Sequence, residues 1–480
     1  MEKNRDEFWR ISATELSQRI DAGELSPVEL LEHCLARCRD FDPVINAHVL
    51  VDKDRARRAA IASEQRARVG KRYSRLDGLP LTVKDNIFVA GLRATWGSFF
   101  FAEFVPEEDE IPVARLRRAG AVIAAKTNTC EFAMAPVTEN RLFGVTRNPW
   151  RVDLTPGGSS GGAVASVAAG VFPLAIATDA GGSIRRPASY SGVVGFKPTT
   201  GRVPRVYGFS PLASDFQVVG PIARTVDDVA MLFDVMAGPD RRDCRSYLGQ
   251  FLTHETKSTK IRILAVTNAS GRAIDPEVRA SVEDAAAALT DLGHDVELGP
   301  PPYDIDEIDE IWSILTSVGV KVVLDQFPGQ LDNVDHALVS MAERATDITA
   351  AEYLRALERV TSLRRTFAMQ TECYDVLLTP TSAALPWSID CRFPETIDGR
   401  DVSPRAAAVF ATFVNAVGHP AINLPGKPSR DGLPIGIQLV GRFGEDRRVL
   451  ALAREFETIR PWHDRWPPLV MSATTERVLP

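Results

Sequence analysis

Residues 148–187 read NPWRVDLTPGGSSGGAVASVAAGVFPLAIATDAGGSIRRP, and this stretch decides how the rest of the sequence is interpreted. It contains two glycine-flanked serine sites, GGSSGG at Gly157–Gly162 and GGS at Gly181–Ser183. No charged side chain occurs from Leu154 to Thr178. We therefore expect two serines that glycine loops place in a dry and closely packed environment.

The uncharged span between the two serine sites predicts a buried helix followed by a strand. Residues 163–170 are small, which allows a helix to pack closely, and residues 173–178 resemble a short apolar strand. Similar strands are predicted upstream at 79–86 and 121–125, with a helical pattern between them. Alternating strands and helices predict an α/β fold, with a central mixed β-sheet covered by helices on both faces.

We expect residues 1–480 to form a single domain, because no repeat, low-complexity tract or clear linker interrupts the sequence. Residues 1–72 are predicted to be an N-terminal helical segment. Ser12 and Ser26 are candidate helix N-caps there, since a glutamate follows each of them three residues later. Residues 240–350 are expected to be a variable region within the domain. The pattern is least clear at 300–345, where helices are expected.

The composition is that of an ordinary globular protein, with 45% hydrophobic and 25% charged residues. A net charge of -7 argues against direct nucleic-acid binding and against binding to an anionic membrane. The best apolar stretch, 163–178, is shorter than the roughly 20 residues that a membrane span needs. The charged N-terminus lacks the apolar core of a signal peptide, and six cysteines are too few for a disulfide scaffold. We expect a cytoplasmic protein with reduced thiols.

Cys34 and Cys38 are four residues apart and could bind a metal from one face of a helix. No further cysteine or histidine follows at the spacing of a zinc site. Together with Leu31 and Leu35 they fit a buried helix face better. No metal and no cofactor are therefore expected.

The loop Gly157–Gly162 precedes a predicted helix, whose first N–H groups can bind an anion. It is not a phosphate-binding P-loop, because no Gly-Lys-Ser/Thr sequence follows. It also matches G-x-S-x-G, centred on Ser159 or Ser160, which is the nucleophile elbow of α/β-hydrolases. Asp375 and His419 would then be the acid and the base. This alternative is disfavoured because no strand is predicted directly before the loop.

Ser183 follows a predicted strand and a tight Ala-Gly-Gly turn. Such a turn can direct successive N–H groups toward one point beside the serine hydroxyl, as in an oxyanion hole, where each donor stabilises the transition state by roughly 3 kcal/mol. A serine nucleophile also needs a base. No histidine lies near either loop, and a lysine can serve if burial lowers its pKa from about 10.4. Lys84, Lys126 and Lys197 are the local candidates, and their spacing leaves the choice open.

Three further motifs make the sequence resemble the amidase signature family. LTVKD at 81–85 precedes the central stretch, and GVVGFKP at 192–198 and LPIGIQ at 433–438 follow it. The resemblance covers nearly the whole chain and is weak only around 240–350. It implies the amidase-signature fold and hydrolysis of amides through an acyl-enzyme by a Ser–cis-Ser–Lys triad.

Matched motif by motif, the resemblance implies that Ser183 is the nucleophile, Ser159 the bridging cis-serine and Lys84 the base. It also implies a backbone oxyanion hole made by the N–H groups of Ala180, Gly181, Gly182 and Ser183. Three residues match positions that support this loop, namely Thr178, Asp179 and Arg185.

Two branches of the family fit the sequence. One is a free-standing amidase that acts on a small or aryl carboxamide. The other is the glutamine-hydrolysing A subunit of a tRNA-dependent amidotransferase, which usually carries a basic stretch resembling G-x-E-V-K-R-R-I-x-L-G. Residues 337–358 lack that stretch. We favour the free-standing hydrolase of linear amides, with a small-molecule substrate, no direct nucleic-acid or membrane partner, and a homodimer as one possible assembly.

Three residues are candidates for contacting the substrate, Phe132, Thr178 and Arg186. An arginine at the position of Arg186 binds a substrate carboxylate in malonamidase-like members of the family, and a structural ion pair or a surface arginine is the alternative. Phe132, with Cys130, could line an acyl pocket, although core packing explains both residues equally well. None of these assignments identifies the substrate.

Overall fold

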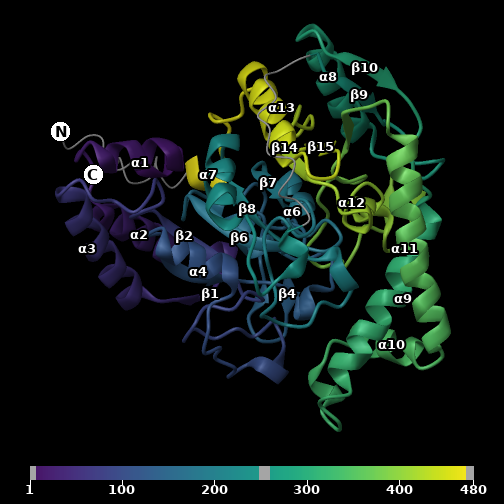
Figure 1. The fold of residues 1–480 in the computed structure, drawn as a ribbon, viewed down its shortest axis with the longest axis horizontal. Coiled ribbons are helices and arrows are strands. Elements are labelled where there is room, and N and C mark those ends of the chain that lie inside the picture. The colour runs from purple at the N-terminus through teal and green to yellow at the C-terminus, as the bar shows by residue number, and fades with distance from the viewer. Residues whose placement is uncertain (1–6, 248–259, 472–480) are drawn as a thin grey trace.

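A computed structural model describes residues 7–247 and 260–471, and an eleven-stranded β-sheet forms its centre (Figure 1). The strands of the sheet are β1 (His48–Val51), β2 (Pro80–Lys84), β3 (Val122–Thr127), β6 (Leu174–Asp179), β7 (Val194–Lys197), β8 (Val218–Ala223), β9 (Arg262–Ala265), β10 (Asp295–Leu298), β11 (Val376–Pro380), β14 (Ala421–Pro425) and β15 (Gly436–Gly441). Their order in space is β1-β3-β2-β6-β8-β7-β14-β15-β11-β9-β10.

The sheet is mixed, as the sequence predicted. β2 is parallel to β3 and β6, whereas β8 is antiparallel to β6 and β7. Two small hairpins lie outside it, β4 (Glu139–Asn140) with β5 (Gly144–Val145) and β12 (Thr396–Ile397) with β13 (Arg400–Asp401). The predicted α/β class is therefore confirmed.

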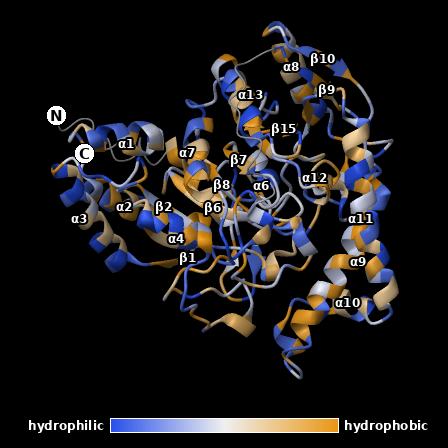
Figure 2. Ribbon diagram, viewed as in Figure 1, coloured by the Kyte–Doolittle hydropathy of each residue, from blue (hydrophilic) through white to orange (hydrophobic). Residues whose placement is uncertain are grey.

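Helices flank the sheet, and Figure 2 shows hydrophobic residues concentrated in the central strands and polar residues on outer helices such as α3. The helices are α1 (Ala13–Asp21), α2 (Pro27–Ile45), α3 (Lys53–Arg68), α4 (Ile111–Arg118), α5 (Gly161–Ala168), α6 (Arg185–Ser191), α7 (Val226–Met236), α8 (Pro276–Asp291), α9 (Ile305–Leu324), α10 (His336–Ala345), α11 (Ala350–Gln370), α12 (Thr412–Val417) and α13 (Asp446–Ile459). No helix of the described ranges is long and apolar enough to cross a membrane.

The N-terminal helices begin where the sequence predicted. Ser12 Oγ accepts from the N–H of Glu15 at 3.1 Å, so it caps α1. Ser26 caps α2 in the same way, accepting from Val28 and Glu29. These caps satisfy N–H groups that the first turn of a helix leaves without a partner.

The two glycine-flanked serine sites meet because of the way β2 and β6 pair. The strands are parallel, with Leu81 opposite Leu174 and Val83 opposite Ile176, so both end at the same edge of the sheet. The first loop leads into α5 and the second leads from β6 into α6. Both loops therefore lie beside the carboxyl end of β2.

Residues 300–345, whose sequence pattern was the least clear, contain the whole of α9 and α10. Figure 1 shows α9 and α11 side by side at one end of the molecule, with α10 beyond them. Residues 248–259 of the predicted variable region and residues 1–6 of the predicted N-terminal segment lie outside the described residues.

An aromatic cluster packs against α9 and α10. Trp96 stacks on Phe209 with ring centroids 4.6 Å apart and also contacts Phe132 at 5.0 Å. Phe100 stacks on Phe327, just after α9, at 4.2 Å. The contact with Trp96 in this aromatic cluster restrains Phe132, one of the candidate substrate-binding residues.

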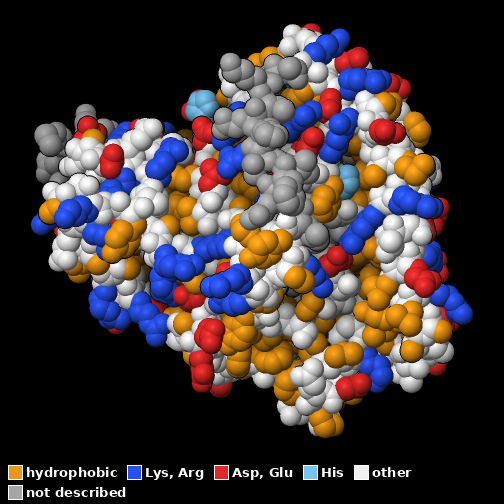
Figure 3. All heavy atoms as spheres, viewed as in Figure 1, with side chains coloured by type: hydrophobic (Ala, Val, Ile, Leu, Met, Phe, Trp, Pro, Cys, Tyr) orange, Lys and Arg blue, Asp and Glu red, His pale blue; other side chains and the backbone are white. Residues whose placement is uncertain are grey.

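On the surface, Figure 3 shows hydrophobic side chains gathered along the lower part of the face in view.

Candidate active site

Lys84 is the last residue of β2, and its side chain is fully buried. Its Nζ lies 2.7 Å from Ser159 Oγ, 2.9 Å from Ser160 Oγ and 3.2 Å from Thr178 Oγ1. All three partners are hydroxyl groups, so none of them balances a positive charge. Burial lowers the pKa of Lys84 to about 7. A substantial fraction of the amine is therefore neutral near neutral pH, as a general base requires.

The other two candidate lysines point away from the serines. Lys126 Nζ donates to the carbonyls of Ile87 and Arg93 and lies 3.6 Å from Asp85 Oδ1. Lys197 Nζ donates to the carbonyl of Pro198 at 2.9 Å. Of the three candidates, the structure brings Lys84 to the serine loops.

The first loop holds Ser159 in a crowded backbone arrangement. The peptide bond between Gly158 and Ser159 is cis. A Cβ atom at Gly158 would clash with the carbonyl group of Val137, so only glycine fits there. Ser160 Oγ also lies beside Lys84 and 3.3 Å from the carbonyl oxygen of Thr178. The G-x-S-x-G pattern allows either Ser159 or Ser160 as its central serine. In the structure, Lys84 Nζ contacts the hydroxyl groups of both.

Asp179, at the end of β6, shapes the second loop. Its Oδ1 accepts from the N–H of Gly182 at 2.8 Å, and its Oδ2 accepts from the N–H of Ile184 at 3.1 Å. The N–H of Gly182 is therefore not available to a substrate, which departs from the expected set of four oxyanion donors. The N–H groups of Ala180, Gly181 and Ser183 have no hydrogen-bond partner among the described residues.

Asp179 itself is held by a buried ion pair. Arg185 Nη2 lies 2.9 Å from Asp179 Oδ1, and Asn415 Nδ2 donates to the same oxygen at 2.9 Å. Arg185 is fixed in turn by Gln438 at 2.7 Å. Burial alone would raise the pKa of Asp179, but Arg185 and Asn415 outweigh it and hold that pKa well below its usual value. Asn415 and Gln438 come from distant segments; the sequence presents Gln438 only as the end of the LPIGIQ motif and gives no signal for Asn415.

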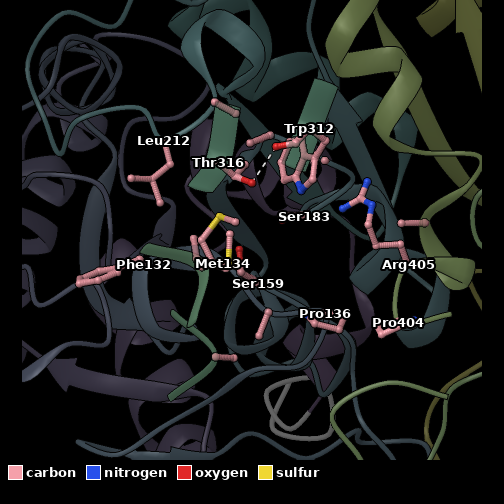
Figure 4. Close-up of a pocket in the computed structure, with 18 of the residues that line it drawn as sticks. Phe132, Met134, Pro136, Ser159, Ser183, Leu212, Trp312, Thr316, Pro404 and Arg405 are labelled. Carbon is pink, nitrogen blue, oxygen red and sulfur yellow. Dashed lines mark hydrogen bonds between the residues drawn. The ribbon is translucent and has the colours of Figure 1, made fainter. Parts of the chain in front are cut away.

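Ser159 and Ser183 both line a cavity of about 500 Å³ (Figure 4). Phe132, Met134 and Leu212 lie on one side of it in the figure, and Trp312 and Thr316 of α9 lie above the serines. Within the described part of the chain, no hydrogen bond joins the two serine hydroxyls. The structure thus brings both serines to one cavity without forming the direct contact that a proton relay needs.

The cavity wall is rich in arginine. Arg186, Arg344, Arg392 and Arg405 line it, and no aspartate or glutamate of the described ranges does. Arg405 is paired with Asp309 at 2.7 Å and Arg392 with Asp335 at 2.5 Å. Arg186 is buried, and its Nε has no partner among the described residues. Arg186 is thus not a surface arginine, and it forms no ion pair within the described part of the chain. The wall favours a ligand that carries hydrogen-bond acceptors or negative charge.

The histidine and aspartate of the nucleophile-elbow alternative lie elsewhere. His419 Nδ1 is 2.8 Å from the carbonyl oxygen of Gly441, and burial lowers the pKa of this histidine to about 4. Asp375 pairs with Arg448 at 2.7 Å. Neither residue lines the cavity that contains Ser183. That alternative is wrong for this fold.

Comparison with known proteins agrees with this geometry. The family model described as Amidase matches residues 29–450. The A subunit of glutamyl-tRNA(Gln) amidotransferase from Symbiobacterium thermophilum is 36% identical, over 96% of this chain and 99% of that protein. Acylamidase of Rhodococcus erythropolis is 34% identical, over 95% of this chain and 97% of that protein. The structure of 6-aminohexanoate cyclic dimer hydrolase complexed with substrate superposes with a TM-score of 0.87 at 30% identity, covering 96% of this chain and 100% of that one.

Proposed function

The chain belongs to the amidase signature family, and we propose that it is a free-standing amidase that hydrolyses a small or aryl carboxamide through an acyl-enzyme on Ser183. The observation that carries this proposal is the buried contact of 2.7 Å between Lys84 Nζ and Ser159 Oγ, beside a cavity that Ser183 also lines. A buried lysine with a lowered pKa and no anionic partner is suited to act as a base.

In the proposed reaction Ser183 Oγ attacks the amide carbonyl carbon. Its proton passes to Ser159 while the Ser159 proton passes to the neutral Lys84. The N–H groups of Ala180, Gly181 and Ser183 stabilise the oxyanion that forms on the carbonyl oxygen. When the carbon–nitrogen bond breaks, the relay returns a proton to the leaving amine. Water then attacks the acyl-enzyme through the same relay and releases the carboxylate.

The relay needs Ser159 and Ser183 to approach each other in the substrate complex. Catalytic hydrogen bonds are often long in the free enzyme and shorten when the substrate binds. Thr178 supports this arrangement, because its hydroxyl accepts from both Lys84 and Asn86. Phe132 and Arg186 are the proposed substrate contacts, the first with apolar groups and the second with a carboxylate.

The decisive experiment is mass detection of an acylated Ser183 during turnover of an anilide. We expect the wild-type chain to accumulate a single acyl adduct on the peptide that contains Ser183. The Ser183→Ala variant should lose the adduct and at least about 10³-fold in kcat, since the covalent route is removed. Turnover that survives this substitution would refute the mechanism.

The second candidate function is that of an amidotransferase A subunit, which the 36% identity to such a protein favours. Its reaction would be glutamine hydrolysis that depends on partner subunits. The same serine and lysine residues would serve both functions, so substrate and partner dependence are what separate them.

A further inference from the structure

Gln217 lines the cavity at the point where the 3-10 turn Ser214–Phe216 passes into β8. Its backbone is extended, with φ -82° and ψ 126°, and the next residue, Val218, pairs with Asp179 of β6. Continuing this antiparallel register by one residue brings Gln217 beside Ala180. Gln217 thus borders the start of the loop whose N–H groups are the proposed oxyanion donors.

Arg205 fixes the orientation of the Gln217 amide group. Arg205 Nη1 donates a hydrogen bond to Gln217 Oε1. A guanidinium group has only donors and can never accept, so the partner atom must be the amide oxygen and not the nitrogen. The NH₂ end of Gln217 therefore points away from Arg205.

Arg205 cannot easily turn to release this contact. Its Nε donates to Glu110 Oε2 at 2.6 Å, and its Nη2 donates to Glu110 Oε1 and to the carbonyl oxygen of Asn86, each at 3.2 Å. Glu110 is fully buried and also accepts from the N–H of Phe88 at 3.0 Å. This two-point ion pair restrains the guanidinium plane and, through it, the amide of Gln217.

Among residues 7–247 and 260–471, the NH₂ group of the half-buried Gln217 donates a hydrogen bond to no acceptor, and the side chain is bonded through Oε1 alone. The charged side chains that share the cavity wall are arginines, which cannot accept either. An unused donor in a half-buried wall is a place where a ligand acceptor would be recognised.

We propose, on the basis of the amidase function above, that Gln217 donates from Nε2 to a second acceptor of the substrate, apart from the scissile carbonyl. The enzyme thereby selects amides that carry a further carbonyl or comparable oxygen. An amide that lacks this oxygen leaves the donor unpaired and binds more weakly, by about tenfold for one hydrogen bond.

The experiment measures binding by calorimetry on the Ser183→Ala variant, so that turnover does not interfere. Two matched ligand pairs are used. The ketone lies on the acyl side of the amide in the first pair and on the aniline side in the second. The first pair is N-phenyl-4-oxopentanamide with its methylene isostere, N-phenyl-4-methylpent-4-enamide. The second is N-(4-acetylphenyl)butanamide with N-(4-isopropenylphenyl)butanamide. Neutral ketones separate the effect of Gln217 from the attraction of an anion to Arg186.

Gln217→Glu is the informative substitution, because it keeps the shape and the acceptor for Arg205 but replaces the NH₂ group, the proposed donor, by oxygen. We expect the ketone of at least one pair to bind about tenfold more tightly than its isostere, and Gln217→Glu to abolish this preference while the isostere keeps its affinity within about twofold. Gln326→Glu, at an exposed position just after α9, adds the same charge outside the cavity and should leave the preference unchanged.

Three results would overturn the inference: no ketone preference in either pair, a preference that persists in Gln217→Glu, or an equal loss of affinity for ketone and isostere. The last result would mean that Gln217 only supports the cavity wall. Failure of the amidase mechanism would appear separately, as turnover by Ser183→Ala without acylation. Binding and turnover therefore report on the two proposals independently.

Discussion

The three buried lysines near the serine loops differ in their partners rather than in their burial. Lys126 has a carboxylate, Asp85, at 3.6 Å, whereas Lys84 meets hydroxyl groups. Lys197 resembles Lys84 in that burial lowers its pKa to about 7, yet its Nζ donates to the Pro198 carbonyl. At the scale of single residues, Lys84 is therefore proposed as the base because it contacts Ser159, whereas Lys126 and Lys197 have structural partners.

The pH dependence of amide hydrolysis should report the ionisation of Lys84. Because the neutral amine is the active form, kcat/KM should rise with pH, reach half of its maximum near the Lys84 pKa of about 7, and be about tenfold below the plateau one unit lower. A pH–rate profile from about pH 5.5 to 9 on a neutral anilide checks this.

Lys197→Met is the matched control, since Lys197 titrates in the same range but lies outside the cavity. Lys197 forms no ion pair among the described residues, so replacing it by an apolar side chain leaves no direct partner charge unpaired. The inflection near pH 7 should persist in this variant. Its disappearance would assign the titration to Lys197 instead.

Arg186→Ala should weaken the binding of acidic amides and spare neutral ones. The buried guanidinium, with an unpartnered Nε, can form a charge-assisted hydrogen bond worth about 1.5–3 kcal/mol to a substrate carboxylate. We expect KM for succinamic acid to rise at least about tenfold, and KM for butyramide to stay within about twofold. Steady-state kinetics on both amides test this, with Arg241→Ala on the surface as control. Equal effects on the two substrates would exclude carboxylate binding.

At the scale of elements, the site depends on how the end of β6 turns into α6. Asp179 orders this turn by accepting from two loop N–H groups and by pairing with Arg185, the first residue of α6. Trp312 of α9 covers the turn, since a Cβ at Gly181 would lie 2.9 Å from its indole ring. α9, from the region with the least clear sequence pattern, therefore covers one side of the site.

Asp179→Asn should destabilise the fold strongly, because it leaves Arg185 charged and buried without a counter-ion. Losing one partner of a buried pair costs about 3–5 kcal/mol. Urea unfolding measures the change in the free energy of unfolding. Asp215→Asn is the control, since Asp215 pairs with the partly exposed Arg364 and should cost less than about 1 kcal/mol. Similar losses in both variants would contradict the role assigned to the Asp179 pair.

At the scale of the whole molecule, the sheet joins β1, near the N-terminus, to β14 and β15, near the C-terminus. On this basis we propose that the chain folds as one domain. The first and last parts of the described residues are also in contact, because the ring centroids of Trp9 and Trp466 lie 4.6 Å apart. Relatives of this chain include an acylamidase and the A subunit of an amidotransferase, so assembly must be tested on the chain itself.

The purified chain should hydrolyse anilides without any partner. We expect measurable turnover of an aryl amide by the isolated chain, and glutamine hydrolysis at least about tenfold less efficient in kcat/KM. Kinetics combined with light scattering, which gives the mass of the active species, test this. Glutamine-selective activity that appears only with co-purified partners would instead favour the amidotransferase function.

Much of the element order was predictable, because burial and capping leave local patterns. Fully apolar strands, serine N-caps and the glycine-rich loops were all visible in the sequence. The bounds and the role of α9 and α10 were not predictable, because the faces of these helices that line the cavity carry mixed residues such as Trp312, Ser313 and Thr316. Their role depends on what they cover.

The sequence by itself determined the α/β class, the family and the two serine loops, since local spacing and composition encode glycine turns and buried strands. Residue spacing left three lysines open, and the family resemblance then implied Lys84 as the base and four oxyanion donors; neither gave Gln217 a role. Only the tertiary structure decided that Lys84 meets Ser159, that Asp179 occupies the N–H of Gly182, and that Arg205 orients Gln217. The reason is physical: hydrogen bonds and desolvation act between groups that lie close in space, and those groups are far apart along the chain.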